Sequence, residues 1–285
     1  MIDINAFHYS TLVLSGGGIK GFQHLGGLYY LFRYVPYNHF KRYVGSSIGA
    51  VILFLCSLGY TPFELFYFFY RFEVMSLRLS INFLNLIQEF GMNSQEPFLE
   101  LLRGFMRRKN LDCDLTLAQH SQLTGIDLTI SVTNLTTFKP EFLSPASHPD
   151  LPVLTALAMT TCLPLFFKPV LHDGCHYLDG GLSNNYPIEL YPDSFGMLII
   201  DIDCAQPEVP ENLVGFLFRL FNYSVFQNVY SKYPSYEEHT VVFINRNKLT
   251  PVSLWMDEEQ KMELFREGYR LVRRFFWEKG NKDSE

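Results

Sequence analysis

The pentapeptide GSSIG at residues 45–49 constrains this chain more than any other segment, because it places one serine in a Gly-x-Ser-x-Gly frame. The strand-like residues 42–44 precede it, and the apolar residues 48–55 follow it with helical character. A serine in this frame, between a strand and a helix, is typical of a nucleophile elbow, a strained turn that exposes the serine hydroxyl. Glycine at both ends fits that turn, because a side chain there would crowd the junction. The segment therefore predicts Ser47 as a nucleophile.

Two further segments combine an apolar strand with glycines. Residues 11–14 form a short apolar strand that runs into SGGGIKG at residues 15–21, and residues 22–32 then have a helical pattern. Far downstream, a Tyr-Leu pair leads into Asp179-Gly180-Gly181. The aspartate is remote from the serine in sequence, so the two meet only through tertiary folding.

The order of these motifs resembles the patatin-like phospholipase family over about residues 10 to 200. That family has a Gly-Gly-Gly-x-Arg/Lys-Gly oxyanion loop, a Gly-x-Ser-x-Gly nucleophile and an Asp-Gly-Gly/Ala base. Residues 158–169 look like the Pro-x-x-Phe-x-Pro stretch that precedes the family's aspartate. Two departures are small: Ser15 stands where many members carry an acid, and Lys20 where arginine is commoner. Neither departure removes a group that the chemistry needs.

The resemblance implies an α/β fold, a three-layer sandwich with a mainly parallel central sheet. It implies one domain over residues 1–285, with a motif-bearing core at about 10–200 and C-terminal helices at about 211–278. The implied activity is that of a phospholipase A-type acyl hydrolase, which cleaves esters of glycerophospholipids or related lipids through a Ser-Asp dyad and an acyl-enzyme. The site residues carried over are the nucleophile Ser47 and the proton acceptor Asp179, the oxyanion-loop residues Gly16, Gly17, Gly18, Lys20 and Gly21, and the elbow and base-loop glycines Gly45, Gly49, Gly180 and Gly181.

Elementary chemistry limits how such a dyad works. A fully solvated aspartate is a poor base for a serine hydroxyl, but a dry pocket raises its proton affinity. Lys20 has two interpretations: it orients the glycine loop or meets a lipid phosphate, or it is a solvated lysine at a helix start. Asn184 and Asn185 are expected to satisfy backbone groups around the dyad.

Three other functions compete with this interpretation. The glycine loop formally matches the G-x-G-x-x-G of dinucleotide-binding proteins, but no acidic residue follows at the distance that ribose binding needs, since none lies between Asp3 and Glu64. A Ser-His-Asp α/β-hydrolase places its histidine last, and His239 is the only histidine after Asp179. A non-catalytic lipid-binding protein is the third alternative, although every reacting group is present.

Charge, cysteine spacing and the first residues of the chain indicate which cofactors, partners and cellular compartment to expect. A net charge of −6 and a pI near 5.8 argue against a nucleic-acid binder. The five cysteines lack paired spacing, and no ligand cluster predicts a metal, so we expect no cofactor, no metal and no disulfide framework. Residues 1–5 do not resemble a signal peptide. We therefore expect an intracellular protein that contacts membranes peripherally through its lipid substrate, without a transmembrane span.

Aromatic residues are abundant, at 16% of the chain, and many follow the elbow helix. Thr61, Pro62 and Glu64 predict a capped helix start at the beginning of residues 62–73. This helix is expected to present the rings of Phe63, Phe66, Tyr67, Phe69 and Tyr70. This segment, with residues 83–90, is either a cap that meets the lipid surface or part of the core. Further strands are expected at 127–132, 139–143, 196–201 and 241–244, helices at 151–161, 212–229 and 257–277, and weakly structured zones at 78–97, 144–150 and 280–285.

Overall fold

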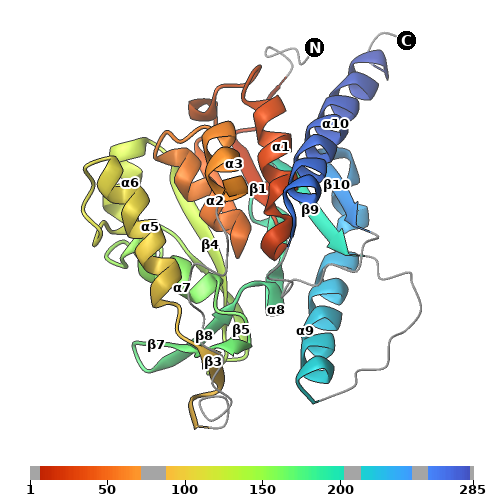
Figure 1. The fold of residues 1–285 in the computed structure, drawn as a ribbon. Coiled ribbons are helices and arrows are strands. Elements are labelled where there is room, and N and C mark those ends of the chain that lie inside the picture. Colours follow the sequence, from red (N-terminus) through yellow and green to blue (C-terminus); the bar gives the residue numbers. More distant parts are fainter. Residues whose placement is uncertain (1–6, 72–87, 202–212, 246–255, 283–285) are drawn as a thin grey trace.

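A computed structural model describes residues 7–71, 88–201, 213–245 and 256–282 (Figure 1). Its described residues form an eight-stranded sheet in the order β10-β9-β1-β2-β4-β8-β7, with β5 also paired to β4. The parallel strands are β1 (Thr11–Leu14), β2 (Arg42–Ser46), β4 (Asp127–Asn134), β9 (Ser194–Asp201) and β10 (Thr240–Asn245). Antiparallel pairing adds β5 (Lys139–Leu143), β7 (Val170–His172) and β8 (Cys175–Asp179). Separately, β3 (Gly91–Asn93) pairs with β6 (Leu165–Phe167).

Helices connect the strands and cover the sheet, as Figure 1 shows. They are α1 (Gly21–Leu31), α2 (Ile48–Ser57), α3 (Pro62–Arg71), α5 (Glu96–Arg108), α6 (Leu117–Thr124), α7 (Val153–Thr160), α8 (Gly181–Asn184), α9 (Leu213–Tyr230) and α10 (Glu258–Lys282). Short 3₁₀ turns are η2 (Gly18–Lys20), η3 (Tyr37–His39), η5 (Ile188–Leu190) and η6 (Tyr233–His239).

The central strand β1 is buried on both faces of the sheet. Leu12 and Leu14 point into the larger core, which contains side chains of α1, α2 and α10. Val13 points to the opposite face, where it packs with Tyr186 and Val229. Alternating side chains on a strand face opposite sides, so these two cores lie on either side of one sheet. The predicted three-layer α/β fold with a mainly parallel sheet is confirmed.

Most of the predicted elements are present, but the region around residues 78–97 differs from the prediction. Residues 91–93 form strand β3 and residues 96–97 begin α5, where a weakly structured zone was expected. The pairing of β3 with β6 and the burial of the apolar face of α5, which includes Leu102, Phe105 and Met106, are the tertiary contacts that order residues 91–97. At the other end of the chain, α10 extends to Lys282 and so includes part of the predicted weakly structured tail.

The aromatic helix α3 divides between core and surface. The predicted capping box is present, since the Glu64 carboxylate accepts from the Thr61 N–H at 2.8 Å and the Thr61 hydroxyl accepts from the Glu64 N–H. Phe66 is buried, with its ring centroid 4.2 Å from that of Phe265 in α10, so this ring belongs to the core. Of the accompanying segment 83–90, residues 83–87 lie outside the described residues.

Within the described ranges, no helix is both long enough and apolar enough to cross a membrane.

Candidate active site

Ser47 occupies a sharp turn between β2 and α2. Its backbone has φ 50° and ψ −128°, a conformation that an L-residue adopts only when its surroundings enforce it. The turn brings α2 against the end of β1: a Cβ added at Gly49 would lie 2.5 Å from the Ser15 carbonyl oxygen, and one at Gly45 would lie 2.5 Å from the Ala50 nitrogen. The local geometry is that of the predicted elbow.

Thr160, the last residue of α7, holds this turn in place. Its hydroxyl accepts the Ser47 N–H at 2.9 Å and donates to the carbonyl oxygen of Ser131 in β4 at 2.6 Å. The side chain is fully buried, so both bonds are shielded from water. Sequence reasoning missed this residue, because nothing in its spacing from Ser47 shows that the two meet.

Asp179 lies at the end of β8, on the other side of β4 from Ser47. Ser46 of β2 is paired with Ser131 of β4, and the next residue of β4, Val132, is paired with Asp179. The two strand registers therefore bring the elbow and the aspartate to the same level of the sheet. Gly180 makes this approach close, because it lies directly against the Ser131 carbonyl and the Ser46 hydroxyl.

Asp179 is buried, with 2% of the residue exposed. Burial raises the pKa of Asp179 to about 7, an effect opposed by interactions with the Ser47 hydroxyl and the Gly181 N–H, which lower it. The Gly181 N–H donates to Oδ1 at 2.7 Å, whereas Oδ2 has no hydrogen-bond partner of standard geometry among the described residues. The contact with Ser47 is thus longer or less well aligned than an ordinary hydrogen bond. This is common in active sites without substrate.

The glycine loop at residues 16–18 lies between β1 and η2, beside the elbow. A Cβ added at Gly16 would lie 3.1 Å from the Ser47 Cβ, so the loop borders the serine directly. The Gly16 N–H donates to the Asn185 carbonyl at 3.3 Å, whereas the N–H groups of Gly17 and Gly18 make no hydrogen bond to another described residue.

Ser15 and His24 fix the start of this loop. The Ser15 hydroxyl accepts the Ile199 N–H at 2.9 Å, and its carbonyl lies 2.9 Å from His24 Nε2. Because a carbonyl only accepts, Nε2 of His24 carries the proton. Burial lowers the pKa of His24 to about 4, so this ring is neutral at physiological pH.

Lys20 and Gly21 lie at the start of the helical segment that follows the loop. Lys20 is completely buried, so the interpretation of this side chain as a solvated lysine is wrong: the chain packs it inside the fold at the helix start. Gly21 faces the elbow helix, where a Cβ would lie 2.8 Å from Ile48 Cγ1.

The two asparagines after the base loop are held through their own backbone groups, and the Asn184 side chain donates from Nδ2 to the Glu189 carboxylate at 2.8 Å rather than to backbone around the dyad. The Ser131 hydroxyl donates to the Asn184 carbonyl at 2.8 Å. The Asn185 N–H donates to Oδ1 of Asn228 at 3.2 Å, and Nδ2 of Asn228 donates to the Gly181 carbonyl at 2.9 Å. Asn228 therefore ties α9 to the loop that carries Asp179, a role that the sequence did not reveal.

His239 lies apart from this site. It ends η6, directly before β10, and its Nδ1 lies 2.9 Å from the Tyr9 hydroxyl, which precedes β1. Ser47 follows the opposite end of the neighbouring parallel strand β2. The structure therefore does not bring His239 to Ser47 and Asp179, and it assembles no Ser-His-Asp triad from these residues.

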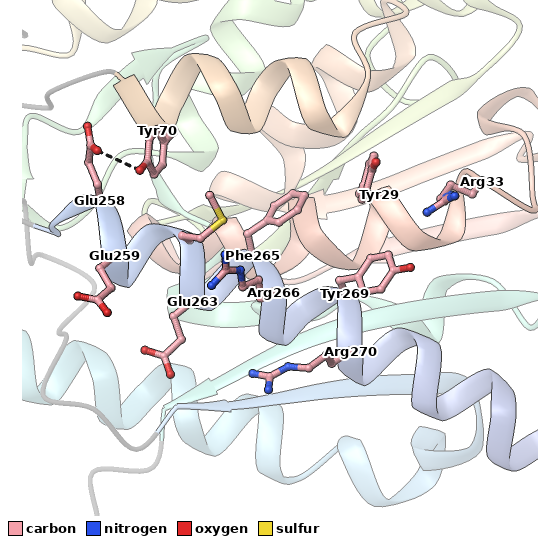
Figure 2. Close-up of a pocket in the computed structure, with 11 residues that line it drawn as sticks. Tyr29, Arg33, Tyr70, Glu258, Glu259, Glu263, Phe265, Arg266, Tyr269 and Arg270 are labelled. Carbon is pink, nitrogen blue, oxygen red and sulfur yellow. Dashed lines mark hydrogen bonds between the residues drawn. The ribbon is translucent and has the colours of Figure 1, made fainter.

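The described residues contain no group of three or more His, Cys, Asp or Glu side chains that is arranged to hold a metal ion. A groove along α10 is lined by Tyr29, Tyr70, Glu258, Phe265, Arg266 and others, with Tyr70 hydrogen-bonded to Glu258 (Figure 2). None of the residues that line this groove belongs to the elbow, the glycine loop or the base loop.

Residues 12–191 match the family model described as patatin-like phospholipase. Among curated proteins, the probable lipid hydrolase 463L of Invertebrate iridescent virus 6 is 33% identical over 188 residues, covering 64% of this chain and 63% of that protein. The chain thus spans less than two thirds of that relative. The uncharacterized protein R571 of Acanthamoeba polyphaga mimivirus is 26% identical, covering 95% of this chain and 94% of that protein.

Two solved structures have the same fold. VipD from Legionella pneumophila aligns with a TM-score of 0.60 at 14% identity, covering 94% of this chain and 67% of VipD. ExoU, in its complex with SpcU from the type III secretion system of Pseudomonas aeruginosa, aligns with a TM-score of 0.52 at 17% identity, covering 95% of this chain and 52% of ExoU. At these identities the likeness shows the fold alone.

Proposed function

Because this chain belongs to the patatin-like phospholipase family, we propose that it is a lipid acyl hydrolase of the phospholipase A type, with Ser47 as nucleophile and Asp179 as base. Its substrates are carboxylic esters of glycerophospholipids or related lipids, in keeping with the relative named as a probable lipid hydrolase. The observation that carries the proposal is the buried Asp179 carboxyl beside a strained serine elbow, with the glycine loop bordering the serine through Gly16.

The reaction begins when Ser47 Oγ attacks the ester carbonyl carbon and Asp179 takes the hydroxyl proton. The carbonyl π electrons move onto oxygen, and the N–H groups of Gly17 and Gly18 stabilise the resulting oxyanion. When the tetrahedral intermediate collapses, the ester C–O bond breaks and Asp179 returns the proton to the departing alcohol. Water then attacks the acyl carbon of the acyl-enzyme and gives a proton to Asp179. When this second tetrahedral intermediate collapses, the bond between the acyl carbon and Ser47 Oγ breaks, Asp179 returns the proton to Oγ, and a fatty acid is released.

Burial is what makes an aspartate suitable for this work. With a pKa of about 7, Asp179 is ionised in a large fraction of molecules at neutral pH and still binds a proton strongly enough to remove it from serine. An exposed aspartate, with its ordinary value near 3.9, is a much weaker base. The mechanism needs neither a metal nor an organic cofactor, and it contains no step for nucleic acid.

Labelling by a fluorophosphonate, which reacts with activated serines, tests the nucleophile. We expect a single site of labelling at Ser47, and loss of both labelling and ester hydrolysis in Ser47→Ala. The matched control is Ser46→Ala, because Ser46 is the buried neighbour whose hydroxyl has no hydrogen-bond partner among the described side chains and backbone groups. Hydrolysis that persists undiminished in Ser47→Ala would refute the proposed mechanism.

A further inference from the structure

Unlike a typical surface helix, α9 has apolar side chains on both its inward and its outward face. Residues 213–230 contain a single charged residue, Arg219, and many large apolar side chains. One face of the helix packs inward: Phe221 and Val229 are buried, and the Ser224 hydroxyl donates to the Leu182 carbonyl at 2.8 Å. A surface helix normally presents charged and polar side chains on the opposite face.

The outward face of α9 is instead a stripe of exposed apolar side chains. Its members recur at helical spacing along the whole element: Phe216, Leu220, Tyr223, Phe226 and Tyr230. The rings of Phe226 and Tyr230 are stacked, with centroids 5.5 Å apart. We call these five residues the α9 stripe. Contiguous exposed apolar surface of this kind marks a site that meets a partner or a membrane.

The inner face of the same helix contacts the loop that follows Asp179. Asn228 bonds to Gly181, the first residue of α8, and to Asn185, the residue after it, and Val225 lies beside Gly181. Figure 1 shows α9 next to α8, and the two helices are in contact. A surface that binds the outer face of α9 therefore lies about one helix diameter, roughly 10 Å, from the loop that carries Asp179.

We infer that the α9 stripe docks the protein onto the surface of a lipid bilayer, with the helix lying in the interface. This inference rests on the proposed function, because a lipid acyl hydrolase must reach substrate that resides in a bilayer. The chemistry of the stripe fits: phenylalanine and leucine enter the acyl boundary, and tyrosine hydroxyls stay at headgroup level.

This inference assigns the lipid-facing surface to α9, whereas the sequence offered α3 as a candidate for that role. In α3, Phe66 is part of the core, and the exposed rings Phe63 and Tyr67 lie on a helix that packs against α1 and α10. The chain supplies a matched control as a result. Phe216 and Tyr223 of α9 are 48% and 63% exposed, and Phe63 and Tyr67 of α3 are 50% and 58% exposed.

The test measures binding to phosphatidylcholine vesicles by flotation, in a Ser47→Ala background so that lipid is not consumed. We expect Phe216→Ser/Tyr223→Ser to weaken vesicle binding by at least about tenfold, since two partly buried rings are lost from the interface. The control pair Phe63→Ser/Tyr67→Ser should bind vesicles as the parent does. With Ser47 present, the α9 pair should lose hydrolysis of vesicle lipid and keep both its melting temperature and its hydrolysis of a soluble short-chain ester.

Three outcomes overturn the inference. Unchanged vesicle binding by the α9 pair is one, and equal loss in the α3 pair is another. The third is a dimer of the parent, seen by sedimentation without lipid, that the α9 substitutions dissociate, because the stripe would then bind a second copy of the chain. Failure of the proposed function looks different: the parent would bind vesicles through the α9 stripe and yet hydrolyse neither vesicle lipid nor soluble ester.

Discussion

Single side chains set the geometry around Ser47, and Thr160 is the least expected of them. It bridges the elbow and β4 with one hydroxyl that both accepts and donates. The glycines, Ser47 and Asp179 were predictable because their motifs are local in sequence. Thr160, Asn228 and the carbonyl of Asn185 were not, because each acts on the site through a contact between elements that only the folded chain brings together.

Thr160→Val keeps the shape of the side chain and removes both hydrogen bonds. We expect kcat for a soluble ester to fall by about tenfold or more with KM nearly unchanged, because the elbow N–H and the Ser131 carbonyl lose their buried partner. Thr160→Ser, which retains the hydroxyl, should restore most of kcat. A uniform loss of stability with unchanged kcat in Thr160→Val would reduce this residue to a structural role.

At the scale of elements, the packing of α2 against β1 fixes where the serine stands. The first strands and the helices after them were predictable from apolar runs and glycines, and they agree with the structure within a few residues. Strands β6, β7 and β8 are three to five residues long, too short to give a clear periodic signal, and α5 was not predicted either. Their order comes from pairing and packing with distant parts of the chain.

Gly49→Ala tests the contact between α2 and β1. The added methyl would lie 2.5 Å from the Ser15 carbonyl oxygen, so either the helix or the glycine loop must shift. We expect a lower melting temperature and loss of ester hydrolysis. The control is Gly104→Ala in α5, where an added Cβ meets nothing within 4 Å and alanine favours the helix by up to about 1 kcal/mol. A silent Gly49→Ala would show that this junction is not as close as the structure indicates.

For the whole molecule, the single domain over residues 1–285 stays a prediction.

The buried Asp179 makes the free energy of unfolding depend on pH. Its folded pKa of about 7 lies above its ordinary value, so the neutral form suits the fold, and stability is lost as pH rises through this range. Asp179→Asn removes that cost. We expect the variant to gain more in melting temperature over the parent at about pH 8 than at about pH 5. Equal gains at both pH values would mean that Asp179 titrates normally.

The central claim, that Asp179 rather than a histidine serves as the base, is tested most directly by turnover of a soluble short-chain ester. Asp179→Asn should lower kcat by at least about 100-fold, the lower range for a positioned general base, while the fold is retained. His239→Ala should leave kcat nearly unchanged, because His239 contacts Tyr9 and lies apart from Ser47. A mild effect of Asp179→Asn together with a large loss in His239→Ala would contradict the account and favour a Ser-His-Asp mechanism.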